Sequence, residues 1–292
     1  MVGEEVTIAG FAESVRGRGG ICFVTLRDGT GKIQAFLKRG SLDDESFEAV
    51  QSSPRESTIM FRGNVARKRP PKTPEGAPPP PKEYEVTVSA AELLATAQTP
   101  LPVGVVDDVN VGLDTRLDNR HLDVRRSHVN AMFILRSKVL QYGREHLIEE
   151  GFNEMNSPKI IASASEGGTN LFPMMYFDTP AFLSQSPQLY KQLAVLGGLE
   201  RVFEIGPAFR AEKHDTYRHL NEFVSFDIEA AWCDDEDVMG VLERMIHSIW
   251  KSVSEKDGHL IETINHYRTT QGLEPVKVCL LYTSDAADEV DR

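Results

Sequence analysis

Apolar and polar residues alternate through much of the first hundred positions, and this two-residue period predicts β-strands. One short helical pattern covers residues 41–52, and Gly, Asp and Pro turns separate the alternating runs. Several short strands bounded by such turns are typical of a small β-barrel. The alternating runs are EVTIAGFAESV, ICFVTLRD, IQAFLK, STIMFRGNVARK and EYEVTVSAAELLA.

Residues 70–81, PPKTPEGAPPPP, interrupt this pattern with seven prolines in twelve positions. Proline fixes φ and has no backbone N–H, so the segment is neither a central strand nor a helix. We therefore expect an exposed loop that joins two strands.

The pattern changes at Val129, where apolar residues take up helical spacing as far as Ile148, and Gly151 is expected to end that helix. Strand-like and helical runs then alternate without a regular βαβ repeat, which favours an antiparallel α+β domain. The run EDVMGVLERMIHSIWKSV predicts an amphipathic helix capped by Asp234 or Asp235.

Composition limits the class of protein. A length of 292 residues suits two domains, and a hydrophobic share of 40% excludes a wholly disordered chain. No apolar run approaches the roughly 20 residues that cross a bilayer, and MVGEEVTIAG does not read as a secretory signal. Cys22, Cys233 and Cys279 form no CxxC pair, which argues against disulfides or zinc and favours the cytoplasm.

Charge is distributed unevenly along the chain. The net charge is −12, yet residues 1–100 hold 13 basic and 13 acidic side chains and are neutral. A uniformly basic surface for nucleic acid is therefore absent. The neutral balance does not exclude a local basic groove, because phosphate contacts depend on where the charges lie and not on their total.

Candidate chemistry concentrates in residues 209–223, FRAEKHDTYRHLNEF. The sequence contains neither a Walker A motif nor GxGxxG, so a nucleotide would have to be held by arginines and aromatic rings. Arg210 can grip a phosphate, Glu212 can accept a hydrogen bond from an adenine amino group, and Phe223 can stack on a base. By composition alone, a solvated hairpin turn explains the same residues.

The order of the motifs resembles class II aminoacyl-tRNA synthetases. FRAE followed by RHLNEF is similar to their motif 2, and GFNEMNSP, Gly151–Pro158, is similar to motif 1. QSPQLYKQ and SEGGTNLFP resemble the amino-acid pocket and flipping loop of aspartyl-tRNA synthetases of the archaeal and eukaryotic type. The first block resembles their OB-fold anticodon-binding domain. The resemblance implies an α+β protein with an OB-fold barrel and an antiparallel-sheet catalytic domain.

The resemblance also implies roles for single residues. Arg210 would bind the α-phosphate of ATP, Glu212 would meet the adenine, His219 would reach the outer phosphates, and Phe223 would stack on the adenine. In-line displacement of pyrophosphate by a carboxylate gains mainly from positioning and charge stabilisation, which fits Arg210 as the catalytic group. ATP and Mg²⁺ would be needed.

The amino-acid pocket would hold aspartate. Lys191 would pair with the side-chain carboxylate, Gln188 would lie near the amino acid, and Glu166 would bind the ammonium group. Without the QSPQLYK context, Lys191 would read as an exposed helix lysine.

In the barrel, the resemblance implies that Phe23 stacks on the central anticodon uridine and that Gln34 hydrogen-bonds to it, as single-strand readout on OB folds requires. The alternative is a core Phe23 and a surface Gln34. Arg16, Arg18 and Arg27 are weaker candidates for phosphate contacts.

The resemblance stops near Lys277. Motif 3, its ATP-binding arginine and the acidic magnesium ligands are not found in this sequence, so no metal-binding residue is assigned. We expect residues 1–100 to form the anticodon-binding domain, 101–128 a connector, 129–277 a partial catalytic domain, and 278–292 a non-native tail. Such a fragment is expected to be inactive.

The leading interpretation is an aspartate–tRNA ligase that charges aspartate, or both aspartate and asparagine, tRNAs. It would act in the cytoplasm as a homodimer joined through Gly151–Pro158. An asparaginyl-tRNA synthetase and a non-catalytic tRNA-binding module stay open as alternatives. An asparagine synthetase related to these enzymes is disfavoured because its class lacks the barrel.

Overall fold

The computed structural model describes residues 2–68, 83–106, 111–163, 171–213, 216 and 220–278. It divides into two compact units, Met1–Asp123 and Val124–Arg292. The predicted proline-rich loop and nearly all of the predicted tail lie outside the described residues.

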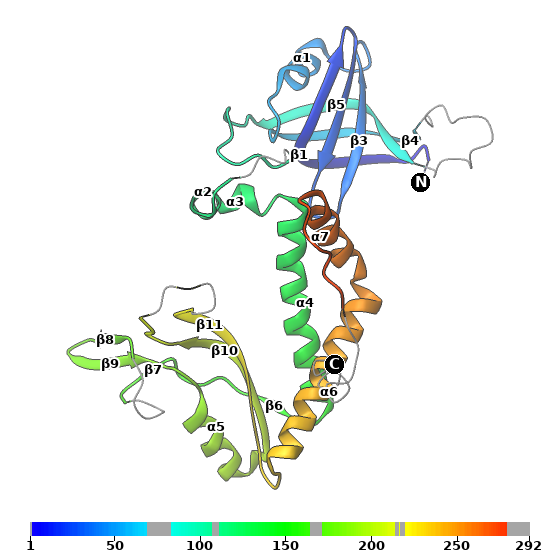
Figure 1. Ribbon diagram of the computed structural model, residues 1–292. Helices are drawn as coiled ribbons and strands as arrows, with labels where there is room; N and C mark the ends of the chain where they lie inside the picture. Colours follow the sequence, from blue (N-terminus) through cyan, green and yellow to red (C-terminus); the bar gives the residue numbers. More distant parts are fainter. Residues whose placement is uncertain are drawn as a thin grey trace. The chain divides into compact units, whose positions relative to one another are not determined.

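The first unit is built around a closed five-stranded barrel with the strand order β1-β2-β3-β5-β4 (Figure 1). β1 is long enough to pair with both β2 and β4, and β3 runs parallel to β5 while the other pairs are antiparallel. The five runs expected from the sequence form these strands. Their bounds are β1 Glu5–Arg18, β2 Ile21–Arg27, β3 Lys32–Lys38, β4 Thr58–Arg67 and β5 Tyr84–Ala95.

Side chains along each strand alternate between the inside and the outside of the barrel, and the apolar ones point inward and form its core. Helix α1, Asp44–Ser52, adds Phe47 and Val50 to this core. A Cβ atom at Gly63 would lie 2.1 Å from the backbone oxygen of Thr87, so only glycine allows β4 and β5 to approach so closely here. The strand residues of the core include Val24, Leu26, Ala35, Leu37, Ile59, Phe61, Val86 and Val88.

The polar stretch after the barrel contains two short helices, α2 Leu113–Asp118 and α3 Arg120–Asp123. Asp123 is fully buried and accepts hydrogen bonds from the guanidinium groups of Arg116 and Arg120, each at 2.8 Å. The mixed charges of this run therefore include a buried carboxylate with two cationic partners.

Three helices form one layer of the second unit. They are α4 Ser127–Glu149, α6 Asp235–Lys256 and α7 Gly258–Thr270, and α4 lies beside the other two (Figure 1). α4 ends as predicted, because Gly151 takes a φ of 83° just beyond it. α6 begins with a capping box between Asp234 and Asp237, which confirms Asp234 as the cap.

Helices α4 and α6 meet over an apolar core that includes Leu147, Met245 and Val253. The hydroxyl of Tyr142 donates to the carboxylate of Asp257 at the end of α6. This hydrogen bond, with burial, raises the pKa of Tyr142 to about 12. Because the Tyr142 hydroxyl keeps its proton at neutral pH, this hydrogen bond connects α4 to Asp257, the residue between α6 and α7.

Two small sheets complete the second unit. In the first, β10, Arg201–Phe209, pairs antiparallel with β11, Glu222–Ala230, and parallel with β6, Asn153–Glu154. The second contains β7 Ile160–Ile161, β9 Thr179–Leu183 and β8 Pro173–Tyr176 in that order. Helix α5, Gln188–Ala194, follows and continues into the π-helical turn η1, Val195–Leu199.

Among the described residues, no helix is both long and apolar enough to span a membrane.

Candidate functional site

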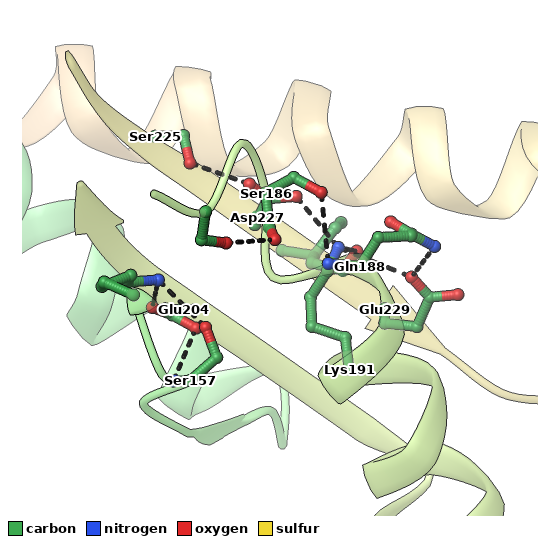
Figure 2. Close-up of polar contacts among 11 residues, drawn as sticks. Ser157, Ser186, Gln188, Lys191, Glu204, Ser225, Asp227 and Glu229 are labelled. Carbon is green, nitrogen blue, oxygen red and sulfur yellow. Dashed lines mark hydrogen bonds and ion pairs between the residues drawn. The ribbon is translucent and has the colours of Figure 1, made fainter. Parts of the chain in front are cut away.

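The ammonium group of Lys191 is the centre of a charged cluster between α5 and β11 (Figure 2). Its side chain is 2% exposed, and Nζ donates to Asp227 Oδ1 and to the backbone oxygen of Ile228, both at 2.9 Å. Nζ also lies 3.5 Å from Glu229 Oε2. A buried ammonium group needs such partners, because an unpaired buried charge is strongly unfavourable.

Two further polar groups hold the acids of this cluster. Gln188 Nε2 donates to Glu229 Oε2 at 3.1 Å, and Ser225 Oγ donates to Asp227 Oδ2 at 2.8 Å. The predicted pocket residues Gln188 and Lys191 are therefore brought together. Glu166, the third predicted pocket residue, lies outside the described residues.

The charges of the cluster add to −1, since Lys191 faces two carboxylates. The side chains of Asp227 and Glu229 are each 26% exposed. The two carboxylates are therefore the solvent-exposed part of the cluster, and the ammonium group of Lys191 is buried behind them. A ligand carboxylate that binds to Lys191 has to replace one of its present partners, and the 3.5 Å contact to Glu229 is the longest of them.

Sequence reasoning missed Asp227 and Glu229. Ser225, Asp227 and Glu229 occupy alternate positions of β11, so they share one face of the strand. Three polar residues in a period-two row on an otherwise largely apolar strand are a signal that could have identified them.

Unlike Asp227 and Glu229, Glu204 of β10 is buried, and it forms hydrogen bonds with the neighbouring segment (Figure 2). It accepts a hydrogen bond from the backbone N–H of Ser157 at 3.0 Å and pairs with the ammonium group of Lys159. Lys159 also donates to Ser157 Oγ at 2.9 Å. The segment that resembles motif 1 is thereby fixed to the strand that leads to Arg210.

Arg210 and Phe223 meet at the end of the paired stretch of β10 and β11. The guanidinium carbon of Arg210 lies 5.5 Å from the centre of the Phe223 ring, and the backbone N–H of Arg210 donates to the oxygen of Asn221 at 2.9 Å. A fixed positive charge beside an aromatic face suits a phosphate and a base. Glu212 is described and half-buried, whereas His219 lies outside the described residues.

The outer face of the barrel carries the other predicted pair. Phe23 of β2 lies opposite Phe36 of β3, with ring centres 5.2 Å apart. Phe23 is half-buried between the fully buried Cys22 and Val24, so it is not a core residue. Gln34 is two positions from Phe36 and shares its face.

Gln34 belongs to a polar row across the same strands. It lies opposite Thr25 and Glu85, and its Nε2 donates to Glu85 Oε2 at 2.7 Å. Thr25 accepts a hydrogen bond from Ser14 Oγ at 3.0 Å. The adjacent groove has a volume of about 510 Å³. Its lining consists of Arg16, Thr25, Lys32, Ile33, Gln34, Lys68, Glu83 and Tyr84.

The three candidate phosphate contacts differ in their surroundings. Arg16 and Arg18 are exposed, and Arg16 lines the groove. Arg27 is buried, and its guanidinium donates to both carboxylate oxygens of Glu56 at 3.0 and 2.8 Å and to Glu13 at 3.2 Å. The structure does not support the expectation for Arg27, because its charge is already paired with the carboxylates of Glu13 and Glu56.

Each of the two units matches a known protein family. The family of "tRNA synthetases class II (D, K and N)" matches residues 112–289, and "OB-fold nucleic acid binding domain" matches residues 6–94. The chain therefore belongs to the class II tRNA synthetases of the D, K and N group. This confirms the fold class expected from the sequence, a barrel plus a class II α+β core.

Within that class, the chain is a homologue of the archaeal-type aspartate–tRNA(Asp/Asn) ligases. It is 46% identical over 262 residues to the ligase of that name from Methanosarcina barkeri, and the match covers 90% of this chain and 57% of the relative. The ligase of Archaeoglobus fulgidus is 46% identical over 256 residues, with 88% and 57% covered. The chain thus spans a little over half the length of these curated relatives.

Solved structures agree with this placement. An asparaginyl-tRNA synthetase from Pyrococcus horikoshii, complexed with asparaginyl-adenylate, superposes with a TM-score of 0.79 at 33% identity and covers 94% of this chain and 61% of that one. A putative aspartyl-tRNA synthetase from Leishmania major gives 0.79 at 32% identity, covering 91% and 51%.

Proposed function

We propose that the chain is part of an aspartate–tRNA ligase that activates aspartate with ATP and transfers it to the 3′ end of tRNA. The observation that carries this proposal is the buried ammonium group of Lys191, which pairs with partly exposed acids of β11, the strand that also carries Phe223. The family membership implies the use of ATP.

In the proposed pocket, the aspartate side chain takes the place of Glu229 beside Lys191. Glu229 keeps its hydrogen bond from Gln188, so it can be displaced without losing every partner. Asp227, fixed by Ser225, remains as the counter-ion of Lys191. An anion enters this site only through such an exchange, because the free cluster is already negative.

In the proposed nucleotide site, adenine stacks on Phe223 and the α-phosphate binds to the guanidinium of Arg210. The charge that develops during attack by the aspartate carboxylate lies on that phosphate, so a preorganised cation there lowers the barrier. Glu212 and His219 are assigned to the adenine and the outer phosphates. Mg²⁺ is proposed as the metal of the reaction, and within the described ranges no group of three or more His, Cys, Asp or Glu is placed to hold a metal.

In the barrel, we assign Phe23 and Gln34 to the central anticodon base. Phe36 enlarges the stacking surface, and Arg16 beside the groove suits the phosphate backbone. We also assign a homodimer contact to Gly151–Pro158, where Asn153 and Glu154 are exposed, and the cytoplasm as the place of action.

A second candidate function is asparaginyl-tRNA synthesis. The negative charge of the Lys191 cluster favours it, because a neutral amide could bind without replacing an acid. The deciding experiment measures binding of non-hydrolysable aspartyl- and asparaginyl-adenylate analogues and of a tRNA anticodon stem-loop by this chain. An ATP–pyrophosphate exchange assay is run beside it, in which we expect the partial catalytic domain to be inactive.

Tighter binding of the aspartyl analogue, weakened in Arg210→Ala, supports the first function, and tighter binding of the asparaginyl analogue supports the second. Exchange that depends on aspartate and is lost in Arg210→Ala would also support the first function, but it would contradict the expected inactivity of this chain. Stem-loop binding without exchange or binding of either amino acid supports a non-catalytic tRNA-binding module. A chain that does none of these contradicts all three.

A further inference from the structure

Ser225 lies on β11 two positions before Asp227, so the two side chains are on the same face of the strand. Ser225 Oγ donates to Asp227 Oδ2 at 2.8 Å, while Asp227 Oδ1 accepts from Lys191 Nζ at 2.9 Å (Figure 2). The two oxygens of this carboxylate therefore have different partners. The hydroxyl holds one oxygen and leaves the other to the ammonium group.

The ammonium group of Lys191 has three N–H donors. Two of its contacts are hydrogen bonds of 2.9 Å, to Asp227 Oδ1 and to the backbone oxygen of Ile228. The remaining contact, to Glu229 Oε2, is 3.5 Å long and exceeds an ordinary N–H···O hydrogen bond. The third donor is thus the one that a ligand carboxylate can use with the smallest loss of existing contacts.

The hydroxyl of Ser225 limits what Asp227 can do to this third donor. The side chain of Asp227 is 26% exposed, and the terminal torsion of an aspartate has a broad energy minimum, so the carboxylate has room to rotate. Without the hydroxyl, Oδ2 would lose its hydrogen bond and could turn toward Lys191 as well. A ligand would then have to displace an acid that uses both oxygens, and not only the distant Glu229.

We infer that Ser225 is a positioning residue that reserves the third donor of Lys191 for the side-chain carboxylate of the ligand. It acts through Asp227, whose second oxygen it keeps away from the ammonium group. A neutral amide gains less from this donor, because hydrogen bonds between two charged groups are stronger. Ser225 therefore favours aspartate over asparagine. This inference rests on the proposed binding of aspartate beside Lys191.

The test uses the full chain and the non-hydrolysable aspartyl- and asparaginyl-adenylate analogues. The measured quantity is the ratio of the two dissociation constants from titration calorimetry. Losses that come from lower stability or from weaker binding of the adenylate moiety are common to both analogues and cancel in this ratio. Ser225→Ala removes the hydroxyl and should lower the preference for the aspartyl analogue by roughly five- to tenfold, the value of one hydrogen bond.

Ser225→Thr and Ser225→Val form a matched pair, because the two new side chains have nearly the same shape and only threonine keeps a hydroxyl. Both are β-branched and suit a strand. The threonine variant should retain the ratio of the unaltered chain. The valine variant should lower it as Ser225→Ala does, which provides a second variant if one of them fails to fold. Ser254→Ala, an exposed serine on α6, is the control and should leave the ratio unchanged.

A ratio that is the same in the unaltered chain, Ser225→Ala and Ser225→Val overturns this inference while leaving Lys191 as the aspartate-binding group. Equal losses of preference in the threonine and valine variants overturn it as well, since the hydroxyl would then make no difference. An unaltered chain that binds the asparaginyl analogue more tightly, or binds neither analogue, contradicts the proposed aspartate function itself and the inference with it.

Discussion

Arg27 in the first unit and Lys191 in the second are both buried cations that pair with two carboxylates, and they differ in how exposed those carboxylates are. Arg27 in the barrel pairs with Glu56 and Glu13, whose side chains are 2% and 12% exposed. Lys191 pairs with Asp227 and Glu229, each 26% exposed. The difference separates a structural ion pair from the proposed binding site, because the acids that pair with Lys191 are the more exposed ones and a ligand can reach them.

The two clusters also differ in charge and in chemistry. Lys32 adds a second cation at Glu13, 2.7 Å away, so the barrel cluster is neutral. Arg27 Nη2 donates to both carboxylate oxygens of Glu56 and Nη1 donates to Glu13, so a ligand carboxylate would have to replace several hydrogen bonds at once. The Lys191 cluster carries an excess negative charge and a point-like ammonium group, which exchanges partners more readily.

The largest expected effect is on stability, in the barrel. Arg27→Met should lower the free energy of unfolding by about 3–5 kcal/mol, because it removes the guanidinium partner of the nearly buried Glu56 carboxylate, whereas Glu13 keeps Lys32. Arg39→Met, which breaks the exposed contact with Glu48, is the control and should cost below about 1 kcal/mol. Urea denaturation measures both. A similar loss in the two variants would mean that Arg27 is not the structural counterpart of Lys191.

The next effect is on ligand binding, in the pocket. Lys191→Met should weaken a non-hydrolysable aspartyl-adenylate analogue by about 2–3 kcal/mol, as expected for losing a hydrogen bond to a charged group, and change ATP affinity little. Lys251→Met, an exposed lysine on α6, is the control. Titration calorimetry measures the affinities. Equal losses for the analogue and for ATP would remove Lys191 from the aspartate pocket.

Stacking on the barrel should have a comparable or smaller effect. Phe23→Ala should weaken binding of an anticodon stem-loop by about 1–3 kcal/mol, the usual loss of one stacked base, and Phe36→Ala should act in the same direction. Leu94→Ala, another exposed apolar residue of the barrel, is the control. Unchanged affinity in both phenylalanine variants would refute the assignment of this face to single-stranded RNA.

These comparisons show what a sequence can and cannot predict. The period of two predicted the strands, and the resemblance placed Phe23 and Gln34, which the structure brings to one outer face. Phe36 was missed although the same alternation puts it beside Phe23. The role of Arg27 could not be predicted, because its partner Glu56 lies 29 residues away in a loop, where no periodic pattern indicates a contact.

The pocket was only partly predictable, because its residues come from distant parts of the chain. The QSPQLYK segment identified Gln188 and Lys191, since both lie on one short helix. The acids that neutralise Lys191 come from β11, 36 residues or more further along the chain. Whether an ion pair is structural or poised for a ligand depends on the exposure of its members, which only the folded chain determines.

The smallest expected effect distinguishes the exposed arginine of the groove from the buried one. Arg16 is exposed and lies opposite Phe23 on the neighbouring strand, so its guanidinium can contact the phosphate beside a stacked base. Arg16→Ala should weaken stem-loop binding by about 0.5–1 kcal/mol, equally for uridine and cytidine, since a phosphate contact carries no base information. It should also reduce the slope of log affinity against log salt concentration by about 0.7, the value for one lost contact to a single strand.

Arg27→Met should leave that slope unchanged wherever the barrel is still folded, because its charge is neutralised inside the protein. Filter binding over a range of salt concentrations measures both slopes, and a reduced slope in Arg27→Met alone would reverse the roles given to the two arginines.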